Sequence, residues 1–198
     1  MTVKNAVRTF FLIAYATTLL FPAISESIPA EVQELISKGP LNCEPTDEEK
    51  LLYSLIMAHR AEQGKPDIPL SQSLTYVAQL HVRDLSANKV SPPYTLHSWS
   101  KNGPWEGVRY TANHRHARLM WNKPKELTNY PGDGFEITFT KKGGASAKSA
   151  FDSWKSQKSV EAIMLNSGNW ETIRWRAIGV GIHGDYAVIW FGDREDTQ

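Results

Sequence analysis

The sequence contains only one cysteine, Cys43, and almost no net charge, since 22 Lys and Arg residues balance 21 Asp and Glu residues. One cysteine excludes an internal disulfide, and no small residues precede Cys43 as a lipid-attachment site requires, so it is either a buried thiol or an intermolecular partner. The basic residues are scattered along the chain. They form no stripe for nucleic acid or for an anionic membrane surface, and we expect neither partner.

Long hydrophobic runs are also scarce, and the clearest one is N-terminal. Residues 9–21 are apolar but too short to span a bilayer comfortably. They follow Lys4 and Arg8 and precede the small residues of Ala23-Ile-Ser25. This pattern is typical of a signal peptide over residues 1–25, cleaved after Ser25, and an uncleaved signal anchor is the alternative. The sequence therefore predicts a secreted or periplasmic protein with no stable membrane anchor.

The length of the chain suits one domain with a sizeable core and is too short for two. We expect an arm rich in Pro, Ser and Glu over residues 26–45, laid over a domain that spans residues 46–192. A tail of residues 193–198 completes the chain, and we expect a monomer.

The stretch from Trp175 to Gly192 predicts a β-hairpin at the centre of this domain. Apolar residues alternate along both halves, and Gly184-Asp185 supplies the tight turn. The second half is apolar on both faces, which indicates a central strand covered by helices on both sides. Gly179 and Gly181 indicate that another backbone or a bulky ring lies against the first strand.

Two helices precede the strands. A capping box over residues 46–49 starts the first helix, and Ser71 or Ser73 caps the second. His59 and His81 lie on the apolar stripes of these helices. We interpret both as histidines hydrogen-bonded in or beside the core, in preference to ligands.

The segment from residue 91 to residue 134 has no periodicity and is dense in aromatic residues and histidine, and so long a loop is often functional. An alternating strand over residues 135–140 follows, with Glu136 on the face opposite its Phe and Ile side chains. Ser146 then caps a third helix. This order of elements predicts an α+β fold, a three-layer α-β-α sandwich with a mainly antiparallel central sheet.

Several of these elements, in this order, resemble the CAP superfamily, which includes the sperm-coating (SCP), pathogenesis-related (PR-1) and venom-allergen type domains. The elements that carry the resemblance are Leu52–Arg60, Gly64, Leu70, Leu74, Ala78, His81, Asp84, His97, Phe135-Glu136, Trp154 and Ile178–Gly181. The resemblance covers roughly residues 47–192, and the sequences at 96–100 and 120–128 look like an exported bacterial branch. It implies secretion, one α-β-α sandwich, and a cleft in which two His and two Glu can hold a divalent cation.

The resemblance carries over only half of that cation site. His97 matches the first family histidine, and Glu136 matches the glutamate that opens the first central strand. Counted from Trp154, the family pattern Trp-x-x-Glu/Ser-x-x-His falls on Gln157 and Val160. Neither is a good metal ligand.

Two ligands do not hold zinc tightly, because zinc sites in proteins have three or four protein ligands. His114 and His116 have the His-x-His spacing that places two imidazoles together in an extended loop, and they offer possible help to His97 and Glu136. We expect no cofactor, with weak binding of zinc as the alternative.

The sequence shows no nucleophile paired with a base. Ser98 adjoins His97, but neighbouring residues of a strand point to opposite faces, and the Gly-x-Ser-x-Gly elbow is absent. We therefore predict a secreted, non-enzymatic CAP domain that binds a small-molecule or protein ligand. The predicted cleft is rich in aromatic residues and is lined by His97, Trp99, Tyr110, Glu136, Gln157 and Val160. The alternatives are a hydrolase that uses His97 and Glu136, which a metal could assist, and a structural module of the cell envelope.

Overall fold

The computed structural model describes residues 28–197. The expected signal peptide and the first two residues of the arm lie outside this range. Within it, no helix is both long enough and apolar enough to cross a membrane.

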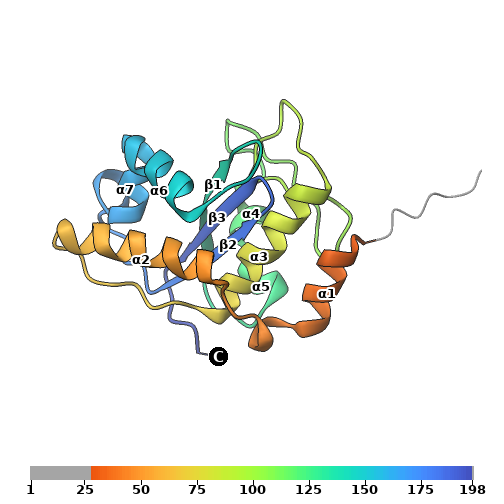
Figure 1. Cartoon of the computed structure of the whole chain (residues 1–198), viewed down its shortest axis with the longest axis horizontal. Helices are drawn as coiled ribbons and strands as arrows, with labels where there is room; N and C mark the ends of the chain where they lie inside the picture. The colour runs from red at the N-terminus through yellow and green to blue at the C-terminus, as the bar shows by residue number, and fades with distance from the viewer. Residues whose placement is uncertain (1–27, 198) are drawn as a thin grey trace, which may run out of the picture.

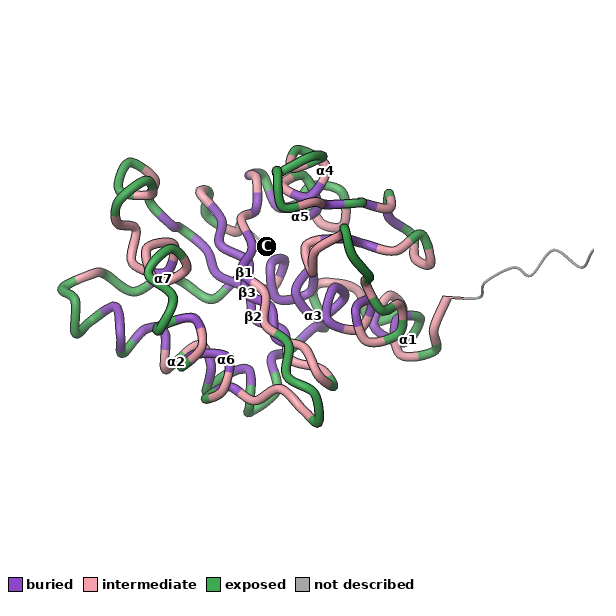
Figure 2. Tube along the Cα trace, turned by 90° about the horizontal axis from the view of Figure 1, so that it is seen from above, coloured by how far each residue is buried: buried purple, intermediate pink, exposed green. Residues whose placement is uncertain are grey.

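A three-stranded antiparallel sheet lies between two layers of helices, which confirms the predicted α-β-α sandwich (Figures 1 and 2). The strands are β1 (Gly134–Thr140), β2 (Ala177–His183) and β3 (Tyr186–Gly192), in the order β1-β3-β2. One layer contains α2 (Asp47–Glu62), α6 (Ala147–Ser156) and α7 (Lys158–Leu165). The other contains α1 (Ala30–Lys38), α3 (Gln72–Ala87), α4 (Ala117–Trp121) and α5 (Lys123–Leu127). Two short 3-10 helices, η1 (Pro40–Asn42) and η2 (Gly168–Trp170), complete the elements.

The predicted hairpin is formed by β2 and β3, and Gly184 takes the positive φ of its turn. β3 is the central strand, as its apolar sequence predicted. Val188 and Trp190 belong to the core cluster on the α3 side, whereas Ile189 and Phe191 belong to the cluster on the α2 side. Both faces of β3 are therefore fully covered.

The two glycines of β2 lie directly against the backbone of α3. A Cβ atom on Gly179 would come within 2.0 Å of the carbonyl carbon of Leu74, and one on Gly181 within 2.5 Å of that of Ala78. The close approach predicted from these glycines is confirmed, and it presses α3 onto the sheet.

The predicted caps are also confirmed. Thr46 and Glu49 form a reciprocal capping box at the start of α2. The Ser71 hydroxyl accepts a hydrogen bond from the Leu74 amide at the start of α3, and Ser146 caps α6. These local bonds satisfy N–H groups that a helix would otherwise leave unpaired.

The N-terminal arm contains a helix, α1, that the sequence did not reveal because no side chain caps its start at Pro29. Val32 and Leu35 are buried in the cluster on the α3 side. Cys43, just after the arm's 3-10 turn, is the buried thiol of the two alternatives: it donates a hydrogen bond to Gln79 Oε1 at 2.9 Å, and burial raises its pKa to about 12. A thiol with this pKa is unreactive near neutral pH.

Candidate functional site

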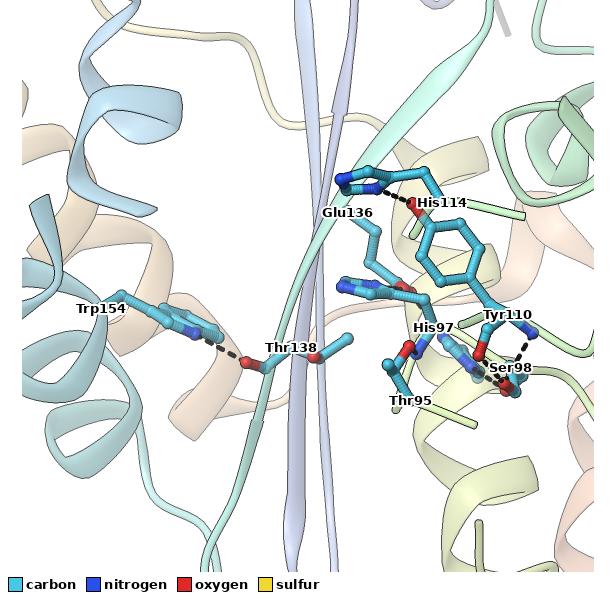
Figure 3. A network of polar contacts seen from close by, with 9 residues as sticks. Thr95, His97, Ser98, Tyr110, His114, Glu136, Thr138 and Trp154 are labelled. Atoms are coloured by element: carbon cyan, nitrogen blue, oxygen red, sulfur yellow. Dashed lines mark hydrogen bonds and ion pairs between the residues drawn. The ribbon is translucent and has the colours of Figure 1, made fainter. Parts of the chain in front are cut away.

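Glu136 lies at the centre of the candidate site. It is on β1, its side chain points toward the α3 layer, and it is fully buried. Its Oε1 accepts a hydrogen bond from His81 Nδ1 on α3, and its Oε2 accepts one from His97 Nδ1 at 2.8 Å. Figure 3 shows Glu136 and His97 together on one side of β1. One carboxylate therefore connects two histidines from different segments of the chain.

His81 carries a positive charge in this arrangement. Its Nδ1 faces the Glu136 carboxylate, and its Nε2 lies 3.0 Å from the Ser98 carbonyl oxygen. Both of these neighbours only accept hydrogen bonds, so both ring nitrogens must carry hydrogen. Burial by itself would lower the pKa of His81, but the Glu136 carboxylate and the Ser98 carbonyl outweigh burial and raise it. The ring also stacks on Trp99, with the centroids 4.2 Å apart.

Glu136 carries the matching negative charge. Burial would raise the pKa of its carboxyl group, but the neighbouring His81 and the hydrogen bonds from both histidines lower it. The result is a buried ion pair with its hydrogen bonds satisfied, the condition under which charges are tolerated inside a protein.

His97 is the member of the group that reaches solvent, with 27% of its side chain exposed. Because Nδ1 donates to Glu136, the neutral ring has an unprotonated Nε2. No hydrogen bond to Nε2 is formed by any residue between 28 and 197. His97 can therefore accept a hydrogen bond, or a proton, from a molecule in the cleft.

Tyr110 and His114 extend this polar group. The Tyr110 ring meets that of His97 edge to face at 5.2 Å, and its hydroxyl is hydrogen-bonded to His114 Nδ1 at 2.7 Å (Figure 3). Burial, with the nearby Glu136 charge, raises the pKa of Tyr110, which keeps the hydroxyl protonated.

These residues line one wall of a cleft of about 440 Å³ beside β1, and the rest of the lining is apolar. The lining residues are His97, Tyr110, His114, Met120, Trp121, Phe135, Glu136, Ile163 and Trp170. The Phe135 ring contacts both indoles, with centroids 5.7 Å from Trp121 and 5.5 Å from Trp170. The volume lies in the range of small-molecule pockets, and like them the cleft has a mainly apolar lining with few polar groups.

Only some of the predicted site residues line the cleft. His97, Tyr110, Glu136 and His114 line the cleft together. Trp99 does not line it: only 3% of the residue is exposed, because it packs behind His81.

His116 is also outside the cleft. It precedes α4 with a φ of 66°, and it is exposed. The left-handed backbone at His114 and His116 breaks the extended conformation on which the predicted His-x-His pair depended.

Gln157 and Val160 do not reach the cleft either, which corrects the geometry expected from the spacing after Trp154. α6 ends at Ser156, so positions 154, 157 and 160 do not share one helix face. Gln157 is exposed, and its side chain donates to the Ser153 carbonyl at 3.0 Å. Val160 packs with the apolar cluster of α2, α6 and α7. Figure 3 shows Trp154 on the side of β1 opposite to Glu136.

Sequence reasoning assigned His81 to the core and missed its role in the site. The interpretation as a buried, hydrogen-bonded histidine is correct, but its partner is the central carboxylate. The pairing joins residues 55 positions apart, which periodicity cannot reveal. The sequence signal for this role was the presence of two ionisable residues, His81 and Asp84, on an otherwise apolar stripe of the helix. The apolar lining, Met120, Trp121, Phe135, Ile163 and Trp170, was also not predicted as part of the cleft.

The residues present do not fit a zinc ion. Both oxygens of Glu136 already accept hydrogen bonds from imidazoles, and His97 offers one nitrogen. Among residues 28–197, no group of three or more His, Cys, Asp or Glu side chains is arranged to hold a metal ion. Zinc sites need at least three protein ligands.

Comparison with known proteins identifies structures that share this fold. No protein-family model matches the sequence, and a search of curated proteins finds no match. Among solved structures, an outer surface protein of Borrelia burgdorferi is similar with a TM-score of 0.51 and 18% identity, over 77% of this chain and 97% of that protein. An extracellular protein of Bacillus anthracis that contains an SCP domain is similar with a TM-score of 0.52 and 14% identity, over 74% of this chain and 40% of that protein. This chain therefore has the fold of SCP domains, the α-β-α sandwich that its motifs predicted.

Proposed function

We propose that this protein is a secreted, non-enzymatic SCP-fold domain that binds a small apolar molecule carrying one hydrogen-bonding group. The observation that supports the proposal is the composition of the cleft. Two indoles, a phenyl ring and two aliphatic side chains surround one polar wall, which ends in the open Nε2 of His97. Sites of this kind gain affinity from apolar contact and select their ligand with few polar groups.

The ion pair behind His97 supports binding more than catalysis. His81 and Glu136 hold the His97 ring in one orientation, so its Nε2 presents a fixed acceptor to the ligand. Pre-organisation of this kind reduces the entropy lost on binding. Because the open His97 Nε2 accepts a hydrogen bond, the ligand group that fits it is a donor, a hydroxyl or an amide N–H.

A hydrolase is the second candidate, and one observation favours it. Glu136 orients His97 as carboxylates orient the general base of many enzymes. A nucleophile is lacking within the site: the Ser98 hydroxyl is buried and is hydrogen-bonded to the Tyr110 backbone, at 3.2 Å to its carbonyl and 3.0 Å to its amide. A water molecule would have to take that role, which leaves binding as the better-supported function.

Calorimetric titration with 2-naphthol and with naphthalene tests the proposal. We expect saturable binding of 2-naphthol at one site, tighter than that of naphthalene because the hydroxyl donates to His97 Nε2. His97→Ala should remove this preference while both compounds still bind.

A matched pair of variants assigns the site. Phe135 and Phe139 are both half-buried on the same face of β1, but only Phe135 lines the cleft, whereas Phe139 packs against Trp154. Phe135→Ala should weaken 2-naphthol binding several-fold, and Phe139→Ala should not. Equal effects of the two variants, or no binding by the wild-type protein, would contradict the proposal. Hydrolysis of p-nitrophenyl acetate that His97→Ala abolishes would favour the hydrolase instead.

Secretion is supported by the N-terminal pattern of residues 1–25. Mass spectrometry of exported protein should find a chain that begins at Glu26. Exported protein that still begins at Met1 would show that no signal peptide is removed.

A further inference from the structure

A second cavity lies in the loops that follow α3, outside the cleft beside β1. It is a groove of about 560 Å³, formed by residues 88–92, Tyr94 and parts of the 98–109 segment. His97 lines the cleft, whereas the next two residues, Ser98 and Trp99, line the groove. The two cavities are therefore separate sites on either side of one short segment.

All charged residues that line the groove are positive. They are Lys89, Lys101 and Arg109. All three are exposed, and within residues 28–197 none of them forms an ion pair with a carboxylate. In a protein whose formal net charge is +1, a groove with three unpaired cations and no lining anion is a local concentration of positive charge. Such a site attracts anions.

One of these cations, Arg109, is oriented by a neighbouring tyrosine, and the stem of a second, Lys101, lies beside Gly107. Arg109 donates one hydrogen bond to the Tyr94 hydroxyl at 3.2 Å, with its guanidinium carbon 5.4 Å from the centre of that ring. The guanidinium group has five N–H donors, so the others stay open for a ligand. The stem of Lys101 occupies the space beside Gly107, where a Cβ atom would lie 2.7 Å from Lys101 Cγ.

A polar wall beside the cations is held by hydrogen bonds within the protein. Buried Asp84 accepts hydrogen bonds from the Ser100 amide at 2.8 Å and from the Asn88 side chain at 2.9 Å. The Asn102 side chain then donates to Asn88 Oδ1 at 2.7 Å. Asn102 and Asn88 both line the groove, and these bonds use only part of the hydrogen-bonding capacity of their amide groups.

We propose that this groove binds an anionic saccharide, a sugar that carries a carboxylate or a phosphate. The cations pair with the anionic group, and the amides and hydroxyls of the wall match the donors and acceptors of sugar hydroxyls. The volume falls in the range of pockets that hold small ligands. Three cations in one groove are too few and too local for the backbone of a nucleic acid, which needs a long row of charges.

Titration calorimetry with the full protein tests the assignment, using glucuronate, glucose 6-phosphate, glucose and inorganic phosphate as probes. We expect both charged sugars to bind about ten-fold more tightly than either glucose or inorganic phosphate, because only they use the cations and the wall together. Their binding should weaken as salt is added, since exposed charges are screened.

A charge-matched pair of double variants locates the site. Lys101→Gln with Arg109→Gln should weaken glucuronate binding about ten-fold or more. Lys141→Gln with Lys142→Gln removes the same charge from an exposed turn outside the groove and should leave the affinity for glucuronate unchanged. Equal losses in both variants, equal binding of glucose and glucuronate, or no binding of any charged sugar would overturn the proposal. Binding of inorganic phosphate as tight as that of glucose 6-phosphate would show a simple phosphate site and would also overturn it.

Discussion

His81 on α3 and Glu136 on β1 form an ion pair in which both side chains are completely buried. The pair connects one helical layer directly to the edge of the sheet and orients His97 toward the cleft. Two opposite charges inside the core are stable only while both are present and fully hydrogen-bonded. Loss of either partner should therefore destabilise the folded protein.

Glu136→Gln should lower the free energy of unfolding by about 3–5 kcal/mol, because it leaves His81 without its counter-charge in a buried position. Urea denaturation of the variant and the wild-type protein measures the difference. His97→Ala is the comparison variant: it leaves the charge of Glu136 paired with His81 and removes one hydrogen bond to the buried carboxylate, so it should cost less, about 1–3 kcal/mol. A loss below about 1 kcal/mol for Glu136→Gln would show that the pair is not charged in the folded protein.

The pH dependence of stability follows from the two shifted pKa values. The pKa of Glu136 is lowered, so its contribution is complete above the unfolded value of about 4.3 and is lost as the pH falls through the folded value. The pKa of His81 is raised, so its contribution is complete below the unfolded value of about 6.5 and is lost as the pH rises through the folded value.

The pair should therefore stabilise the protein most between about pH 4.3 and 6.5. Urea denaturation at a series of pH values would show the decline on both sides, and Glu136→Gln should flatten it. A wild-type stability that keeps rising from pH 6 to pH 8 would contradict the charge assigned to His81.

Gly179→Ala tests the close contact between β2 and α3. The new methyl group would meet the backbone of Leu74, which cannot move aside as a flexible side chain can, so we expect a loss of about 1–3 kcal/mol or more. Gly64→Ala is the control, because nothing lies within 4 Å of its added Cβ and only its positive φ opposes the change. That backbone cost is roughly 1–2 kcal/mol. If thermal unfolding shows that Gly64→Ala destabilises the protein more than Gly179→Ala does, α3 lies farther from the sheet than the structure places it.

Zinc should bind weakly at most. His97 provides one open nitrogen, and both Glu136 oxygens are engaged, so the ligand set falls short of the three or four that zinc sites use. Calorimetric titration of the wild-type protein with zinc measures the affinity. Tight binding that His114→Ala or His116→Ala abolishes would show that the loop histidines rearrange to complete a site.

The local signals in the sequence were reliable where a few neighbouring residues determine the structure. The caps at Thr46, Ser71 and Ser146, and the turn at Gly184, were all placed correctly because each involves hydrogen bonds or dihedral angles within about four residues. The helix α1 was missed because Pro29 provides no capping side chain.

The site was predicted only in part, because it depends on contacts between residues far apart in the sequence. His97 and Glu136 could be identified from their place in the motif order, and the structure joins them. Gln157 and Val160 were expected nearby on the assumption of one continuous helix, but the chain breaks between α6 and α7. A break of one residue changes the direction of every side chain that follows, so helical spacing no longer predicts which residues share a face.

The sequence by itself determined the layers of the fold, because alternating and helical patterns record which face of each element is buried. It also determined that β3 is central and that another backbone or a bulky ring lies against Gly179 and Gly181, and the structure identified that neighbour as α3. Only the tertiary structure decided which polar groups meet. The pairing of His81 with Glu136, the choice between the cleft and the core for Trp99, and the grouping of cations in the loop groove depend on distances between segments far apart in the chain. Those distances are set by the packing of whole elements, which local patterns do not encode.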